Sequence, residues 1–89
     1  MRREDPEQLL RDIGRRIAEL RRECGWTQEQ LAERLGINRR YLARLERGGQ
    51  NLTVHRLAWL AAHLGCRVAD LFVEPVDRHV RIGRPIKAR

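Results

Sequence analysis

Four arginines near the middle of the sequence are the side chains with the clearest potential for chemistry. They are Arg39, Arg40, Arg44 and Arg47. With Ala43 they recur at spacings that bring them onto one face of a helix, and the one acid of this stretch, Glu46, falls off that face. A guanidinium carries a permanent charge and a planar set of donors, which fits phosphate oxygens and the O6 and N7 atoms of guanine. The spacing therefore predicts a helix that binds nucleic acid.

The remaining side chains do not indicate catalysis or metal binding. The sequence has no serine, no phosphate-binding loop and no nucleophile paired with a base. Cys24 and Cys66 form no CxxC pair, which is typical of reduced core thiols in a cytosolic protein. His63 and Cys66 have the spacing of metal ligands, but too few further ligands accompany them. We therefore predict a protein that is not an enzyme and has no cofactor and no metal site.

The net charge of +7 lies entirely in the C-terminal part of the chain. Residues 1–36 are neutral overall, residues 37–89 supply the whole charge, and residues 78–89 alone hold +5. This asymmetry favours a polyanionic partner, and double-stranded DNA is preferred over RNA because the chain lacks an aromatic stacking platform. The longest apolar run, 57–62, is too short for a membrane span. We expect a cytoplasmic, nucleoid-associated protein with no membrane partner.

The hydrophobic spacing predicts the scaffold that must position the arginines, an all-α, compact five-helix bundle over residues 6–72. Four of the helices follow capping residues, and a short fifth helix covers 68–72. The predicted caps are Asp5, with Gln8 reaching back to it, Thr27, in a capping box with Gln30, Asn38 and Thr53. Residues 73–89 are predicted to be a basic tail or a dimerisation strand.

Apolar stripes on two of these helices indicate which sides are buried. The stripe of the first helix consists of Leu9, Ile13, Ile17, Leu20 and Cys24, and Arg11, Arg15, Arg22 and Glu19 are expected on its solvated faces. The stripe of the fourth helix consists of Val54, Leu57, Leu60, Ala61 and Leu64.

The stretch TQEQLAERLGINRRYLARLERG, residues 27–48, resembles the helix-turn-helix of phage-repressor and Cro-type (XRE-like) proteins, and the likeness extends over about residues 12–72. Small Ala32 stands where the two helices cross, and Gly36 stands in the turn. The run R-R-Y-L-x-x-L-E-R-x-x-Q-N-L-T is also similar to restriction–modification controller proteins. The resemblance implies a lambda-repressor-like DNA-binding fold whose second helix enters the major groove.

This resemblance also implies roles for particular residues. Base contacts are expected from Arg39, Arg40, Tyr41, Ala43 and Arg44. Contacts with the DNA backbone are expected from Thr27, Gln28, Arg47, Gln50, Asn51 and Thr53. Arg21 and Glu46 match a structural ion pair between the first and third helices.

The implied function is that of a sequence-specific transcriptional regulator that acts as a homodimer on a palindromic operator. Trp59, His63, Phe72 and Val73 are candidates for the dimer interface. Trp59 is predicted either to form a partner surface or to fold over a neighbouring helix. The alternative function is an antitoxin that binds a toxin and regulates its own transcription through the same domain. Residues 78–89 are compatible with a basic arm on DNA or with a strand paired across a dimer.

Overall fold

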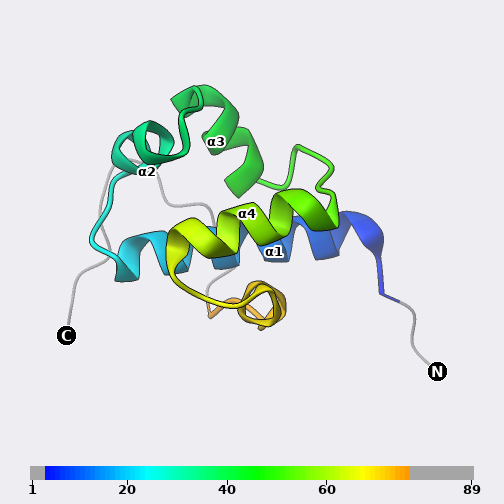
Figure 1. Ribbon diagram of the computed structural model, residues 1–89. Helices are drawn as coiled ribbons and strands as arrows, with labels where there is room; N and C mark the ends of the chain where they lie inside the picture. The colour runs from blue at the N-terminus through cyan, green and yellow to red at the C-terminus, as the bar shows by residue number, and fades with distance from the viewer. Residues whose placement is uncertain (1–3, 77–89) are drawn as a thin grey trace.

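The computed structural model describes residues 4–76, which form four α-helices and one short 3-10 helix (Figure 1). The elements are α1 (Pro6–Glu23), α2 (Gln28–Leu35), α3 (Arg39–Glu46), α4 (Val54–Leu64) and η1 (Val68–Phe72). In Figure 1, α2 and α3 lie on one side of α1 and η1 lies on the opposite side. The prediction of an all-helical fold is confirmed for the described residues, which contain no strand. None of their helices has the length and apolar character needed to span a membrane.

The predicted count of five α-helices is wrong, because the fifth element is a 3-10 helix. The backbone N–H of Asp70 donates to the carbonyl of Arg67 three residues earlier, at 2.9 Å, and the Asp70 carboxylate accepts from the Arg67 N–H at 2.9 Å. Five residues are too few to gain much from α-helical bonding, so the tighter turn closed by this side chain is favoured. The predictions for residues 77–89, including those on the basic tail, concern residues outside the range that the structure describes.

Local capping sets the four α-helix starts, as the sequence predicts. The side chains of Asp5, Thr27, Asn38 and Thr53 each accept a hydrogen bond from a backbone N–H of the first turn. Thr27 and Gln30 form a complete capping box. One detail is wrong: Gln8 does not reach back to Asp5, because its amide donates to the Asp12 carboxylate at 2.8 Å.

The core consists of leucine, isoleucine and alanine side chains contributed by every helix. The most completely buried apolar side chains are Ile17, Leu31, Leu42, Leu45, Leu60 and Leu71. Two predicted core positions are wrong. Val54, the first residue of α4, is 77% exposed, and Cys24, the residue after α1 ends, is also exposed, because both lie beyond the packed part of their helices. Both cysteines are free, and Cys66 is half-buried, so neither is a fully buried core thiol.

The α1 helix passes close to the backbone at the C-terminal end of α3. A Cβ added at Gly14 would lie 2.6 Å from the backbone carbonyl oxygens of Leu45 and Glu46, so only glycine allows this contact. Beside it, Arg15 is buried, which corrects its predicted place on a solvated face. Its guanidinium donates to the backbone carbonyl of Glu46, a group that the end of α3 leaves without a helical partner. The glycine and the arginine together fix α3 on α1.

Candidate nucleic-acid interface

The α2–turn–α3 unit presents a basic face because its apolar residues point the other way. Leu42 and Leu45 of α3 are fully buried, and Ala32 of α2 is buried against the same core. Gly36 has φ of 70°, a left-handed conformation that lets the chain reverse in a short turn. Consequently the opposite face of α3 is open to solvent. It carries four exposed arginines, Arg39, Arg40, Arg44 and Arg47.

The remaining predicted DNA contacts are arranged around this face. Thr27 and Thr53 are exposed helix caps whose hydroxyl oxygens accept from Gln30 and Arg56 N–H groups, at 3.0 Å each, which leaves each hydroxyl proton to donate. Asn51 is exposed, and Gln50 is half-buried with its Oε1 accepting from Arg44 Nε at 3.2 Å. Tyr41 and Ala43 are half-buried at the edge of the arginine face. The predicted contacts thus come from the start of α2, from α3 and from the loop before α4.

Glu46 is the central acceptor behind this face. It is 2% exposed, and its carboxylate accepts from Arg21 Nε at 2.7 Å and Arg21 Nη2 at 3.0 Å, forming the ion pair between α1 and α3. The same carboxylate accepts from Gln28 Nε2 at 2.9 Å. Arg21 also donates to the carbonyl of Trp26 at 2.9 Å, so α1, the α2 entry and α3 share one network. The bidentate geometry is the strong form of such a pair.

The Glu46 bond orients the amide of Gln28. Its nitrogen is held by Glu46, and its oxygen accepts from Arg39 Nη1 at 3.5 Å. Gln28 is the first residue of α2. These two hydrogen bonds use neither its second amide hydrogen nor its backbone N–H, which has no partner within the helix. The spacing of Gln28 and Glu46 could not have revealed this link, because it depends on how α2 and α3 cross.

Arg56 is the residue near this site that the sequence reasoning missed. It lies on α4 with its guanidinium 4.6 Å from the ring centroid of Trp59 and 6.0 Å from that of Tyr41. Arg44 lies 5.9 Å from the same Tyr41 ring. The position of Arg56 three residues before Trp59 on one helix was the available signal. Two cations thus contact Tyr41, which places it within the positive field of the interface.

The four candidates for a dimer interface separate into two kinds. Trp59 is half-buried, packs against the core and meets the His63 ring edge-on at 5.7 Å, so it folds over its own helix and neighbours. Phe72 and Val73, by contrast, are 50% and 49% exposed.

The described residues contain no group of three His, Cys, Asp or Glu side chains arranged to hold a metal ion.

Burial changes the ionisation of one arginine beside the network. Desolvation lowers the pKa of Arg15, and the nearby Glu46 carboxylate opposes that shift. Arginine stays protonated even so, because its ordinary pKa is far above neutrality. Arg15 therefore adds a buried positive charge that holds the end of α3 and strengthens the field around Glu46.

A family model described as helix-turn-helix matches residues 17–71, which is more than half of the chain. This chain belongs to the XRE-like helix-turn-helix family. The resemblance expected from residues 27–48 is therefore confirmed. Membership makes α2 and α3 the helix-turn-helix of a DNA-binding domain of transcriptional regulators.

The chain is similar to regulators of several kinds. It is 46% identical over 65 residues to an uncharacterised helix-turn-helix transcriptional regulator of Sinorhizobium fredii, covering 73% of this chain and 83% of that protein. It is 37% identical over 62 residues to the competence pilus inhibition repressor of Acinetobacter baylyi, covering 70% of this chain and 56% of the repressor. It is 39% identical over 62 residues to the immunity repressor of Bacillus phage phi105, covering 70% of this chain and 43% of that repressor. The chain thus spans about half the length of these two repressors.

Solved structures give the same result for the fold. The restriction–modification controller protein C.AhdI of Aeromonas hydrophila superposes with a TM-score of 0.70 at 35% identity, covering 78% of this chain and all of C.AhdI. A hypothetical transcription factor of Neisseria superposes with a TM-score of 0.67 at 32% identity, covering 84% of this chain and 86% of that one. These relatives are regulators, which confirms the prediction that the chain is not an enzyme.

Proposed function

We propose that this protein is a transcriptional regulator of the repressor or controller type that binds a palindromic double-stranded DNA site as a homodimer. The observation that carries this proposal is the exposed arginine face of α3, held at a fixed angle by the Glu46 network. Similarity to two repressors and to a restriction–modification controller protein supports the same reading. The protein would act in the cytoplasm, where operator DNA is found.

In this proposal α3 lies in the major groove and α2 crosses the phosphate backbone. Arg39, Arg40 and Arg44, with Tyr41 and Ala43, contact base edges, and arginine selects guanine through O6 and N7. The backbone contacts come from Thr27, Gln28, Arg47, Gln50, Asn51 and Thr53. Arg44 would release Gln50 on binding, because Arg44 Nε and Gln50 Oε1 are bonded in the free protein.

This division of labour is tested with Arg44→Ala and Gln28→Ala, measured against a selected operator and against random duplex. Arg44→Ala should weaken operator binding by about ten- to a hundredfold and random binding much less, because one bidentate base contact is worth about 1–3 kcal/mol. Gln28→Ala should weaken both alike, since phosphate contacts carry no sequence information. Arg67→Ala, an exposed arginine beside η1, removes the same charge away from the face and serves as the control. Equal losses on both duplexes for Arg44→Ala would refute the assignment.

Dimerisation would place the two α3 helices about 34 Å apart, on successive major-groove turns. Phe72 and Val73 are the exposed apolar members of the interface candidates, which favours the η1 end of the fold over half-buried Trp59 and polar His63. Val73→Asp should convert a sedimenting dimer to monomer, while Val54→Asp, on an exposed valine at the far end of α4, should leave the dimer unchanged. Co-purification of a second small protein would instead favour the antitoxin function.

A further inference from the structure

A row of stacked side chains joins the arginine face of α3 to α4. Arg44 of α3 has its guanidinium 5.9 Å from the ring centroid of Tyr41, and Arg56 of α4 has its guanidinium 6.0 Å from the same centroid. The two cations are therefore no more than twice that distance apart. Arg56 also lies 4.6 Å from the ring centroid of Trp59 on its own helix. Arg56 thus lies beside the surface that α3 presents, although it belongs to a different helix.

The guanidinium of Arg56 is held in place without a hydrogen-bond acceptor. Arg56 is half-buried, and the Trp59 ring that it contacts packs against the core, so the side chain is ordered. Yet none of its five N–H donors meets an acceptor within residues 4–76. The two buried arginines, Arg15 and Arg21, by contrast both donate to oxygens of Glu46. An ordered, half-buried guanidinium with unused donors indicates an acceptor that a partner supplies.

The charges around Arg56 favour an anion as that acceptor. Residues 47–69 contain no Asp or Glu, so α4 has no carboxylate of its own. The other charged side chain on the Tyr41 ring, Arg44, is also a cation. Two cations beside one ring repel each other, and an anion that accepts from them relieves this repulsion. Phosphate is the anion that a planar guanidinium fits best, because it accepts two parallel N–H bonds.

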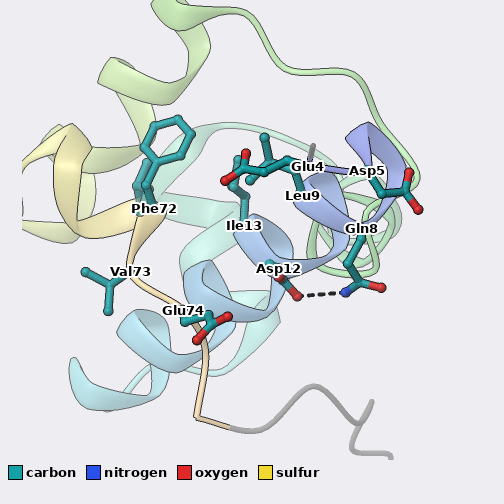
Figure 2. A pocket seen from close by; sticks show the side chains of 10 residues that line it. Glu4, Asp5, Gln8, Leu9, Asp12, Ile13, Phe72, Val73 and Glu74 are labelled. Atoms are coloured by element: carbon teal, nitrogen blue, oxygen red, sulfur yellow. Dashed lines mark hydrogen bonds between the residues drawn. The ribbon is translucent and has the colours of Figure 1, made fainter. Parts of the chain in front are cut away.

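The opposite side of α1 has the reverse character. Figure 2 shows a groove between the N-terminal half of α1 and the segment that follows η1. Its acidic lining residues are Glu4, Asp5, Asp12 and Glu74, and no basic side chain is among the ten residues that line it. This side of the fold therefore offers no cation to a phosphate. A polyanion is directed instead to the side that carries α3.

We propose that Arg56 donates to a phosphate of the DNA backbone beside the groove that α3 enters, and that Trp59 is its positioning residue. This assignment rests on the function proposed above, because it requires α3 to lie in the major groove. That groove is about 12 Å wide, which matches the greatest separation of Arg44 and Arg56 that the Tyr41 ring allows. Arg44 can thus reach a base edge while Arg56 reaches the strand at the rim.

The contact between Arg56 and Trp59 would make this phosphate contact stronger. A free arginine side chain loses rotamer freedom when it binds a phosphate, whereas one already held on a ring loses less. Trp59 would therefore act on DNA through Arg56, without touching the duplex itself.

The test for Arg56 measures binding of the full chain to a random-sequence duplex by fluorescence anisotropy over a series of salt concentrations. Arg56→Gln should reduce the slope of log K against log salt by about one, because each phosphate contact contributes about 0.9. Arg56→Lys keeps the charge and should keep the slope. Arg67→Gln removes a charge beside η1, across α1 from α3, and should also keep it. An Arg56→Gln slope equal to that of Arg67→Gln would overturn the phosphate contact.

The test for Trp59 uses the same duplex. Trp59→Leu removes the ring but leaves the charge of Arg56, so affinity should fall by about two- to tenfold while the salt slope stays the same. Trp59→Phe keeps a ring and should restore most of the affinity. In an Arg56→Gln background, Trp59→Leu should cause no further loss. A loss that persists in that background would show that Trp59 acts independently of Arg56 and would overturn the positioning role.

Arg44→Ala separates this assignment from the proposed function. If the unmodified chain binds no duplex, or if Arg44→Ala binds the selected operator as the unmodified chain does, the proposed function fails and the role of Arg56 fails with it. If Arg44→Ala loses operator binding as expected while Arg56→Gln behaves like Arg67→Gln, only the phosphate contact of Arg56 is refuted.

Discussion

The strongest test of the fold is the replacement of Glu46, whose carboxylate joins three segments. Glu46→Gln preserves the shape but removes the charge opposite Arg21, which donates to it at 2.7 and 3.0 Å. The amide group of the new side chain also turns a donor toward either Arg21 or Gln28. Since Arg21 is 7% exposed, its charge stays buried and is left with two neutral acceptors, the Trp26 carbonyl and the oxygen of the new amide. Breaking a buried pair from one side costs about 3–5 kcal/mol, and we expect about 3 kcal/mol here because the amide oxygen still accepts one bond.

The assay is equilibrium urea unfolding followed by far-UV circular dichroism. With a slope of about 1 kcal/mol/M for a small domain, the midpoint should fall by about 3 M. Glu33→Gln, at an exposed position on α2, is the control and should change the free energy of unfolding by less than about 0.5 kcal/mol.

A double-mutant cycle separates the pair from the site. Arg21→Met with Glu46→Leu removes both charges and fills the space with apolar groups, so it should be less destabilised than the sum of the single changes by about 2 kcal/mol or more. Additive losses, or a Glu46→Gln variant as stable as the Glu33→Gln control, would refute the view that this carboxylate is a buried structural hub.

Three further predictions concern positions away from that hub. Gly14→Ala should destabilise the fold by about 1–3 kcal/mol in the same unfolding assay, although alanine favours helix, because its Cβ would meet the Leu45 carbonyl oxygen at 2.6 Å. Thr53→Ala should lose about 1 kcal/mol of unfolding free energy through the missing cap of α4, and Thr53→Ser should retain it; equal losses would contradict the capping role. Burial, with a smaller contribution from Asp70, raises the pKa of the Cys66 thiol, so less thiolate is present at neutral pH. Iodoacetamide followed by mass spectrometry should therefore modify exposed Cys24 before Cys66 at pH 7.5, and the reverse order would contradict this.

Features set by neighbouring residues could be predicted from the sequence. Thr27 and Gln30 form their capping box within one turn, and Gly36 adopts its left-handed turn where the pattern requires it. The apolar stripes also identified most of the core, since helical periodicity selects the side that packs. These local signals were sufficient to locate the helix-turn-helix and its arginine face.

Features that depend on contacts between distant segments could not be predicted. Arg15 lies off the apolar stripe of α1, as a surface residue would. It is buried because α3 packs on α1 and brings the Glu46 carbonyl, 31 residues away, against it. Val54 fits the stripe of α4, yet the bundle does not extend to the first residue of that helix. The bond between Gln28 and Glu46 likewise requires the crossing of two helices. Spacing within a helix indicates a side, but it does not identify what the neighbouring helix places against that side.

The shared Glu46 carboxylate has a mechanical consequence for recognition. Tilting α3 would stretch hydrogen bonds to Arg21 of α1 and to Gln28 of α2 at the same time. The orientation of α3 is therefore already fixed in the folded protein, and binding to DNA loses little further conformational entropy in this helix. In the homodimer proposed above, a rigidly held α3 would not adjust to an operator whose half-sites are wrongly phased. The duplex would have to bend or twist instead, and the deformability of base pairs that the protein does not touch would become part of its sequence preference.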